Sequence, residues 1–384
     1  METNSKSMRS LYIMQSLAKG FSVFYFVLLP IFYSQKLITS KQIGYIGALF
    51  IVLLILGAIV VARKLHSLDT RKLLLIASFI SILASALLLY GSIDKNLVII
   101  TISYGVMGLS VGTAMSGVNV VAANLTKRGD RYRTLARLSI LTDLVRIVFP
   151  TLVAVFVAVK ATNVSIVLII FAALLFLKLS SNLPKDIYSS NNRSLSEGKI
   201  LNNGPFRYAL SLEFFDSFSS SQLFVFLPLL FLAKGYSIQS SLILQSLIFL
   251  GYLCGRFIVS YIARYSTGIK AVAYAELGMF VCIILILITK QLWVLYLLSF
   301  ILGVFARGTS PVIKALSFDS LETAQMKQGS ALHVVAGDSG SALAQLLFGL
   351  LIAWYGIRSP FIVAAVVAVG IAILCIVKPL KSSS

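Results

Sequence analysis

The chain has 384 residues, of which 58% are hydrophobic and only 12% are charged, and its formal net charge is +20. A soluble domain carries about 25% charged residues, so this composition excludes a water-soluble globule and leaves lipid as the solvent for most of the surface. The basic residues lie in short segments between apolar runs, which favours positive loops at a phospholipid surface over a nucleic-acid-binding face.

Twelve apolar runs follow one another, each long enough to cross a bilayer as a helix of about 20 residues. The first six spans are predicted at 9–34, 42–63, 71–91, 96–122, 134–159 and 164–182. Six more are predicted at 207–233, 238–263, 269–289, 292–315, 329–355 and 358–377. The first run is too long and too interrupted for a cleaved signal peptide, so we expect it to be retained. The pattern predicts an all-α integral membrane protein with twelve transmembrane helices.

A polar segment at 183–206, rich in Ser and Asn, is typical of a flexible linker. It separates an N-terminal six-helix bundle, 1–182, from a C-terminal six-helix bundle, 207–384. Most of the 33 Lys and Arg residues lie on the side of the N-terminus, and the positive-inside rule therefore places both termini and the linker in the cytoplasm. We expect a multi-pass protein of the plasma (inner) membrane, and a monomer.

The two halves carry an internal repeat. Shifting the chain by about 195–198 residues superposes matching residues in the same order. The matched pairs are Pro30 and Pro228, Lys36 and Lys234, Gly57 and Gly255, Lys72 and Lys270, and Asp143 and Asp338. A duplicated six-helix unit predicts two pseudo-symmetric bundles with a binding site between them, near the middle of the membrane.

In these features the chain resembles the major facilitator superfamily. Segment 57–75 (GAIVVARKLHSLDTRKLLL) is similar to the family's loop 2–3 signature, with Arg71 and Lys72 at its basic end and Asp69 displaced. Segment 143–154 (DLVRIVFPTLVA) partly resembles the antiporter motif of drug exporters, because it has Pro150 but lacks the flanking glycines. The resemblance implies alternating access, with spans 1, 4, 7 and 10 around a central cavity.

Ionisable residues inside the spans are the candidate functional residues, because a charge at the bilayer centre costs at least ~2.5–3.5 kcal/mol. For substrate binding and proton coupling they are Lys19, Glu213, Asp216 and Arg307. The resemblance implies that Lys19 faces Asp216 across the cavity, as a functional or a static pair. Glu213 and Asp216 share a helical face, and because two close carboxylates cannot both be ionised cheaply, they favour proton exchange. The alternative places Glu213 in water at the cytoplasmic end.

A second set of charges is predicted to control gating between the halves: Asp143, Arg146, Arg256, Asp338, Arg71 and Lys72. The resemblance implies that spans 5 and 8, and spans 2 and 11, pack along the seam that opens and closes. Asp143 would then reach Arg256, and Asp338 would reach the basic loop at Arg71 and Lys72. The alternative is a static pair between Asp143 and Arg146. We expect structural roles for Glu276 and for His333.

Motifs of other functional classes are missing from the sequence. It contains no GxxxxGK[ST], no HExxH and no GxSxG, and its three cysteines are scattered in apolar runs. We therefore expect no enzyme activity, no metal and no cofactor. The predicted function is secondary active transport of a small molecule, as proton-coupled efflux of an amphipathic compound.

Two alternatives stay open at this point. The first is uptake or export of an organic anion, such as a carboxylate metabolite or a siderophore-like chelate, which Lys19, Arg146 and Arg307 favour. The second is a membrane receptor that does not transport. The predicted partners are a small-molecule substrate, protons and the lipid bilayer, with no nucleic acid.

Overall fold

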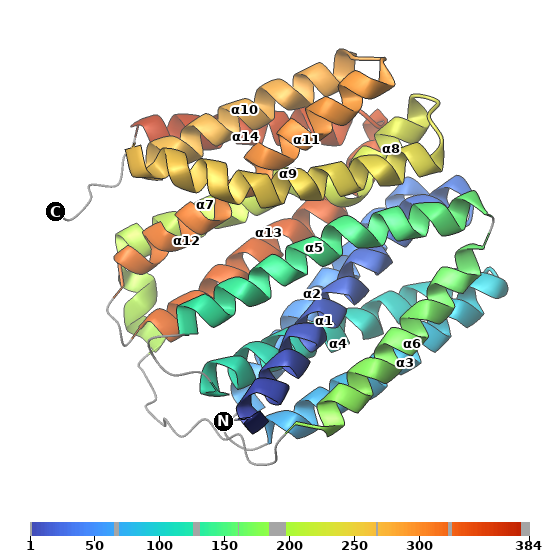
Figure 1. The fold of residues 1–384 in the computed structure, drawn as a ribbon. Coiled ribbons are helices and arrows are strands. Elements are labelled where there is room, and N and C mark those ends of the chain that lie inside the picture. The colour runs from blue at the N-terminus through green and yellow to red at the C-terminus, as the bar shows by residue number, and fades with distance from the viewer. Residues whose placement is uncertain are drawn as a thin grey trace. The chain divides into compact units, whose positions relative to one another are not determined.

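The computed structural model describes residues 2–64, 69–125, 131–159, 161–183, 197–265, 268–321 and 325–377, and the elements assigned there are helices (Figure 1). The chain divides into two compact units, Met1–Asn192 and Arg193–Ser384. Twelve helical spans are long and apolar enough to cross a membrane, which confirms the predicted fold class. The boundaries predicted for the linker stay a prediction, and residues 184–196 of it lie outside the described residues.

In the described part of the N-terminal unit the helices are α1 (Glu2–Ser34), α2 (Ser40–Lys64), α3 (Thr70–Ile93), α4 (Leu97–Leu125), α5 (Arg131–Ala158) and α6 (Thr162–Ser181). Helix α4 packs against α2 and α3, α3 packs against α6, and α1 packs against α5. The displaced Asp69 caps α3, because its side chain accepts a hydrogen bond from the backbone N–H of Arg71 at 3.0 Å. The Arg71 guanidinium donates to the carbonyl of Ser181 at 2.5 Å, which ties the start of α3 to the end of α6.

The C-terminal unit begins with a short 3₁₀ helix, η2 (Glu197–Asn202). Eight α-helices follow: α7 (Gly204–Ser220), α8 (Gln222–Ala233), α9 (Ile238–Tyr265), α10 (Gly268–Ile288), α11 (Leu292–Gly308), α12 (Ser310–Asp319), α13 (Met326–Tyr355) and α14 (Ser359–Val377). Helix α9 packs against α11, α10 against α14, and α7 against α13. This is the packing scheme of the N-terminal unit, helix for helix.

Matched glycines make the same close contact in both units. At Gly57 on α2, an added Cβ would run into the backbone carbonyl of Leu109 on α4, and at Gly255 on α9 it would run into that of Val304 on α11. Gly308 lies against Val259 and the Gly255 backbone. Small residues allow helix backbones to approach this closely in a membrane. The repeat seen in the sequence is thus a repeat of helix packing.

Spans 7 and 10 differ from the continuous helices that the sequence predicts. Span 7 is interrupted between Ser220 and Gln222, and span 10 between Gly308 and Ser310. Serine hydroxyls compete for helix carbonyls in the first case, since Ser219 donates to the carbonyl of Asp216 at 3.0 Å. In the second case Pro311, at the start of α12, has no N–H to donate. Ser221 and Thr309 keep helical dihedral angles, so each span continues across its break.

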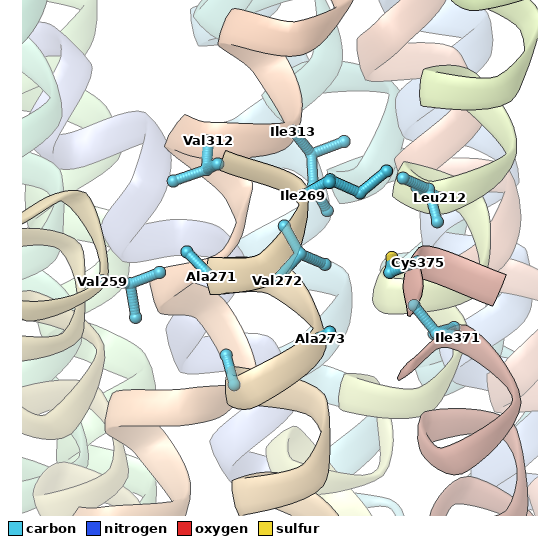
Figure 2. Close-up of a cluster of buried hydrophobic side chains, with 11 residues drawn as sticks. Leu212, Val259, Ile269, Ala271, Val272, Ala273, Val312, Ile313, Ile371 and Cys375 are labelled. Atoms are coloured by element: carbon cyan, nitrogen blue, oxygen red, sulfur yellow. The ribbon is translucent and has the colours of Figure 1, made fainter. Parts of the chain in front are cut away.

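An apolar core surrounds α10 in the C-terminal unit (Figure 2). It joins α7, α9, α10, α12 and α14 through buried side chains, namely Leu212, Val259, Ile269, Ala271, Val272, Ala273, Ala275, Val312, Ile313, Ile371 and Cys375. Figure 2 shows Leu212 and Cys375 on the side of α10 that carries Val272. Any charge placed beside this core is therefore in a medium of low polarity.

Candidate functional site

A polar cavity of about 190 Å³ lies in the C-terminal unit. Its walls come from α7, from the two halves of span 10 and from α13. The lining residues are Glu213, Ser217, Arg307, Ser310, Lys314, His333, Val334, Gly337 and Asp338. Two carboxylates, a guanidinium, an ammonium and an imidazole therefore line one small space.

Glu213 is the centre of this site. This residue is only 5% exposed, whereas the alternative placed it in water. One carboxylate oxygen, Oε1, lies 3.9 Å from Nη1 of Arg307, and the other, Oε2, lies 3.2 Å from Nε2 of His333. Ser217, one turn further along α7, donates its hydroxyl hydrogen to Oε1 at 3.4 Å. The carboxylate thus has partners from three helices.

Gly337 explains how α13 comes close enough to α7 for these contacts. A Cβ at this position would lie 2.8 Å from Oε1 of Glu213 and 3.0 Å from Oγ of Ser217. One turn further along α13, a Cβ at Gly340 would collide with the carbonyl of Phe214. A larger residue at either position would separate the helices and open the ion cluster.

Arg307 lies in the last turn of α11, immediately before the break in span 10. Its Nη1 donates to the hydroxyl of Ser217 at 3.0 Å. The C-terminal end of a helix carries a partial negative charge, which favours a cation there. Lys314, one helical turn beyond the break, places its ammonium 5.6 Å from the ring centroid of Phe318 and completes the basic side of the cavity.

His333 of α13 contacts both Glu213 and Ser317. Its Nε2 lies 3.2 Å from Oε2 of Glu213, and its Nδ1 lies 3.3 Å from Oγ of Ser317. The Ser317 hydroxyl also donates to the carbonyl of Ile313 at 3.0 Å. His333, expected to be structural, therefore contacts a predicted site residue on the wall of the cavity.

Asp216 lies deeper than Glu213 and is fully buried. Its Oδ1 accepts a hydrogen bond from the Thr309 hydroxyl at 2.6 Å, which links α7 to the break in span 10. The Asp216 carboxyl also has a hydrogen-bonding neighbour on α10, the carboxyl of Glu276. Asp216, Arg307 and Glu213 were predicted as site residues, and the structure brings these three together.

Glu276 is a residue that sequence reasoning assigned to structure alone. One face of helix α10 is exposed, with Tyr274 58% exposed, but Glu276 is only 1% exposed. It falls between buried Val272 and Met279, at the spacing of one helical face. The signal was therefore present: a glutamate in the buried stripe of an apolar helix requires a partner.

The candidate residues of the N-terminal unit lie in a different setting. Asp143 and Arg146 form an ion pair within α5, with 3.2 Å between Oδ1 and Nη1. Lys19 is half-buried on α1, and Lys72 is exposed on α3. The predicted pairs of Lys19 with Asp216, Asp143 with Arg256, and Asp338 with the basic loop each join one unit to the other, and they stay predictions.

Comparisons with known proteins agree with the helix packing. The sequence profile of the Major Facilitator Superfamily matches residues 11–290. No curated protein sequence matches the chain. Its fold is similar to a crystal structure of a POT family transporter in complex with a thioalcohol-conjugated peptide, with a TM-score of 0.78 at 15% identity over 98% of this chain and 96% of that one.

Two further solved structures share this fold. The nucleoside transporter NupG has a TM-score of 0.78 at 11% identity, covering 98% of this chain and 99% of its own. The D-xylose–proton symporter has a TM-score of 0.76 at 14% identity, covering 97% and 96%. At these identities the likeness concerns the fold, and the substrate has to be argued from the site.

Proposed function

This chain belongs to the major facilitator superfamily and is a multi-pass membrane transporter, and from that premise we propose that it exchanges protons for a small amphipathic molecule by alternating access. The proposed direction for the substrate is efflux across the plasma (inner) membrane, with both termini in the cytoplasm and the monomer as the working unit. The cavity of the C-terminal unit would couple the movement of the substrate to the movement of the proton.

The observation that carries the proposal is the pair formed by Glu213 and His333. The two side chains lie 3.2 Å apart on the wall of the cavity, and the Arg307 guanidinium lies 3.9 Å from the other oxygen of the same carboxylate. In the proposed mechanism this pair binds and releases one proton. Proton binding and release there change the charge of the cavity wall by one unit. A charged substrate in the cavity senses that change directly, because the surroundings are of low polarity.

Exchange follows when substrate and proton compete for the same group. A cationic amphipathic substrate stabilises the ionised form of Glu213, whereas a proton on Glu213 removes the charge that attracts the substrate. Each ligand thereby weakens the binding of the other, and the linkage is reciprocal. A carrier with this property moves substrate one way and protons the other.

A second candidate function rests on Lys314. Its ammonium lines the cavity together with Arg307, and these two cations favour an organic anion, such as a carboxylate, as the substrate. In that case, protonation of Glu213 adds positive potential to the cavity and strengthens binding of the anion. Substrate and proton would then move together, as symport.

Transport by purified protein in liposomes with an imposed pH gradient tests the proposal. We expect the gradient to drive a cationic amphipathic probe such as ethidium against its concentration gradient. Glu213→Gln is expected to abolish this driven movement, because it removes the group for which probe and proton compete. Asp319→Asn, which neutralises an exposed carboxylate at the end of α12, is the matched control and is expected to behave as wild type.

Three outcomes distinguish proton exchange for a cationic substrate from symport of an organic anion and from the absence of transport. Driven movement of an aliphatic carboxylate but not of the cationic probe, lost on Lys314→Gln, would select the second candidate. A pH response that survives in Glu213→Gln would remove Glu213 from proton coupling. A chain that moves neither class of probe under the pH gradient, while it retains its fold, contradicts the proposed function altogether.

A further inference from the structure

Behind the cavity, two buried carboxyl groups on different helices contact each other: Asp216 on α7 and Glu276 on α10. We propose that Asp216 and Glu276 share one proton and form a second proton-binding site, which is coupled to Glu213 through Arg307. The shared proton is an inference about the protein itself. Its part in transport rests on the proposed function.

The need for a proton comes from the burial of both groups. Asp216 is 0% exposed and Glu276 is 1% exposed. Oδ2 of Asp216 and Oε2 of Glu276 are each buried without a hydrogen-bond partner among the described residues. Ionised carboxylates only accept hydrogen bonds, so two of them in contact repel each other. One proton between them supplies a donor, removes one charge and satisfies both oxygens.

The hydrogen bonds around the pair indicate which member carries the proton. The Thr309 hydroxyl donates to Oδ1 of Asp216 at 2.6 Å, which stabilises Asp216 as the ionised acceptor. The proton therefore lies on Glu276, whose neighbours on α10 belong to the apolar core of Figure 2, including Val272 and Ala275. An acid in that setting is more stable neutral than charged.

The ionisable groups around the pair come from the helices that pack against α7 and α10. Those facing the carboxyls themselves are Glu213 on α7, Arg307 on α11 and Cys375 on α14. Tyr208 of α7 hydrogen-bonds Cys375. Two more groups face Arg307: Tyr252 of α9 and Asp338 of α13. On the cavity side, Lys314 of α12 faces Glu213, and His333 of α13 contacts Glu213. Arg307 is thus the cation that faces both Glu213 and Asp216.

Sharing one guanidinium couples the two proton sites. When Glu213 is ionised, it attracts Arg307 and also repels negative charge on Asp216, so the proton stays on the pair. When Glu213 takes a proton, both effects weaken, and the Arg307 charge favours release of the proton from Asp216 and Glu276. Binding at one site therefore promotes release at the other, and the titrations belong to the cluster rather than to single residues.

Infrared spectroscopy of the purified full-length protein tests the shared proton without any substrate. A protonated carboxylic acid has a C=O stretch well separated from that of a carboxylate. We expect wild type to show such a band from a buried acid at neutral pH and Glu276→Gln to remove it. Asp216→Asn is expected to shift the frequency of the band, because Glu276 keeps its proton but loses the carboxylate that accepts from it. Asp143→Asn is the control, because Asp143 is paired with Arg146 and is expected to add nothing to the band.

The coupling has its own measurement, the midpoint of that band as pH is raised. In Glu213→Gln the pair is expected to lose its proton at about tenfold higher proton concentration than in wild type, which is a shift of about one pH unit. Thermal unfolding of each variant shows whether it is folded, and Glu276→Asp, which retains a carboxyl, is expected to restore the band.

The possible failures can be told apart. A band that persists in folded Glu276→Gln, or one that is unchanged in folded Asp216→Asn, overturns the shared proton. A band that responds to both variants as expected, but whose midpoint does not move in Glu213→Gln, overturns the coupling and leaves a static pair. If the infrared results are as expected but liposomes show no transport driven by a pH gradient, the proposed function fails and the proton site stands.

Discussion

The two units use the same helix packing around polar centres of opposite character. In the N-terminal unit the centre is made of neutral hydroxyls: Tyr25 contacts Ser103 at 3.2 Å, and Tyr104 donates to the carbonyl of Tyr25 at 2.6 Å. All three side chains are fully buried. In the C-terminal unit the polar centre is ionic, because Glu213 contacts both Arg307 and His333.

The difference shows what each kind of polar centre does for a membrane protein. Neutral hydroxyls that are fully hydrogen-bonded hold helices in one arrangement, and their charge does not change near neutral pH. A cluster of acids with a shared cation changes charge with each proton bound, so its preferred arrangement depends on proton supply. We interpret the N-terminal unit as the frame and the C-terminal unit as the part that responds to protons.

Removing the cation of the cluster is the strongest way to break this comparison. Arg307→Ala leaves Glu213 and Asp216 without their common counter-charge, and breaking a buried ion pair typically costs about 3–5 kcal/mol. We expect this loss in thermal unfolding in detergent. Arg307→Ala combined with Glu213→Gln is expected to recover part of the stability, because one uncompensated charge is gone. Equal stability of the single and the double variant would show that Glu213 does not depend on Arg307.

Matched glycine substitutions test whether the scaffold is the same in both units. Gly108 on α4 and Gly303 on α11 each leave no room for a Cβ beside a carbonyl of the facing helix, that of Phe50 and that of Ile248. Overpacking of this kind costs about 1–3 kcal/mol, so Gly108→Ala and Gly303→Ala should destabilise by similar amounts. A large difference between their melting temperatures would mean that the two close helix contacts do not contribute equally to stability.

The neutral centre is tested by removing one hydroxyl. Tyr104→Phe deletes the donor to the Tyr25 carbonyl, at an expected cost of about 0.5–1.5 kcal/mol. Because no group with a titration near neutral pH is involved, the cost should be the same across mildly acidic and mildly alkaline buffers. His333→Gln, at the ionic centre, should by contrast have a larger cost, because it removes the imidazole that contacts the buried Glu213 carboxylate. Equal costs for the two variants would remove the distinction between the neutral and the ionic centre.

The smallest effect is expected at the paired lysines of the repeat. The Lys234 ammonium donates to the carbonyls of Ile286 at 2.7 Å and Thr289 at 2.5 Å at the end of α10, whereas Lys36 is exposed. Lys234→Met is expected to cost about 1 kcal/mol and Lys36→Met close to nothing. Equal melting temperatures for the two variants would show that these carbonyl contacts add nothing.

The Lys234 site also predicts a dependence on pH. Desolvation, followed by the charges of Arg358 and Lys290, lowers the pKa of Lys234 from its usual 10.5. The unfolded chain then binds this proton more tightly than the folded protein does. Stability relative to Lys234→Met should therefore increase as pH is raised through the lowered pKa toward 10.5. A flat difference over that range would contradict the assigned cause.

Much of the fold was accessible from the sequence, while the site was accessible only in part. The twelve spans are local features of hydropathy, and their positions were predicted to within a few residues. Glu213, Asp216 and Arg307 were named because each is a charge in an apolar run. The contacts among these residues were not predicted, because no sequence periodicity relates α7 to α11. The breaks at Ser221 and Thr309 were also missed, because they leave the apolar pattern of the spans intact.

The reason lies in the range over which each kind of information acts. Hydropathy, span length and the placement of Lys and Arg are properties of single segments, and together they dictated a twelve-span membrane protein built as a repeat. Which charges meet depends on how segments far apart in the chain pack. Packing at Gly337 brought His333 to Glu213, and the packing of α10 turned Glu276 toward Asp216. Our proposal of a shared proton therefore rests on burial at those contacts and not on residue type.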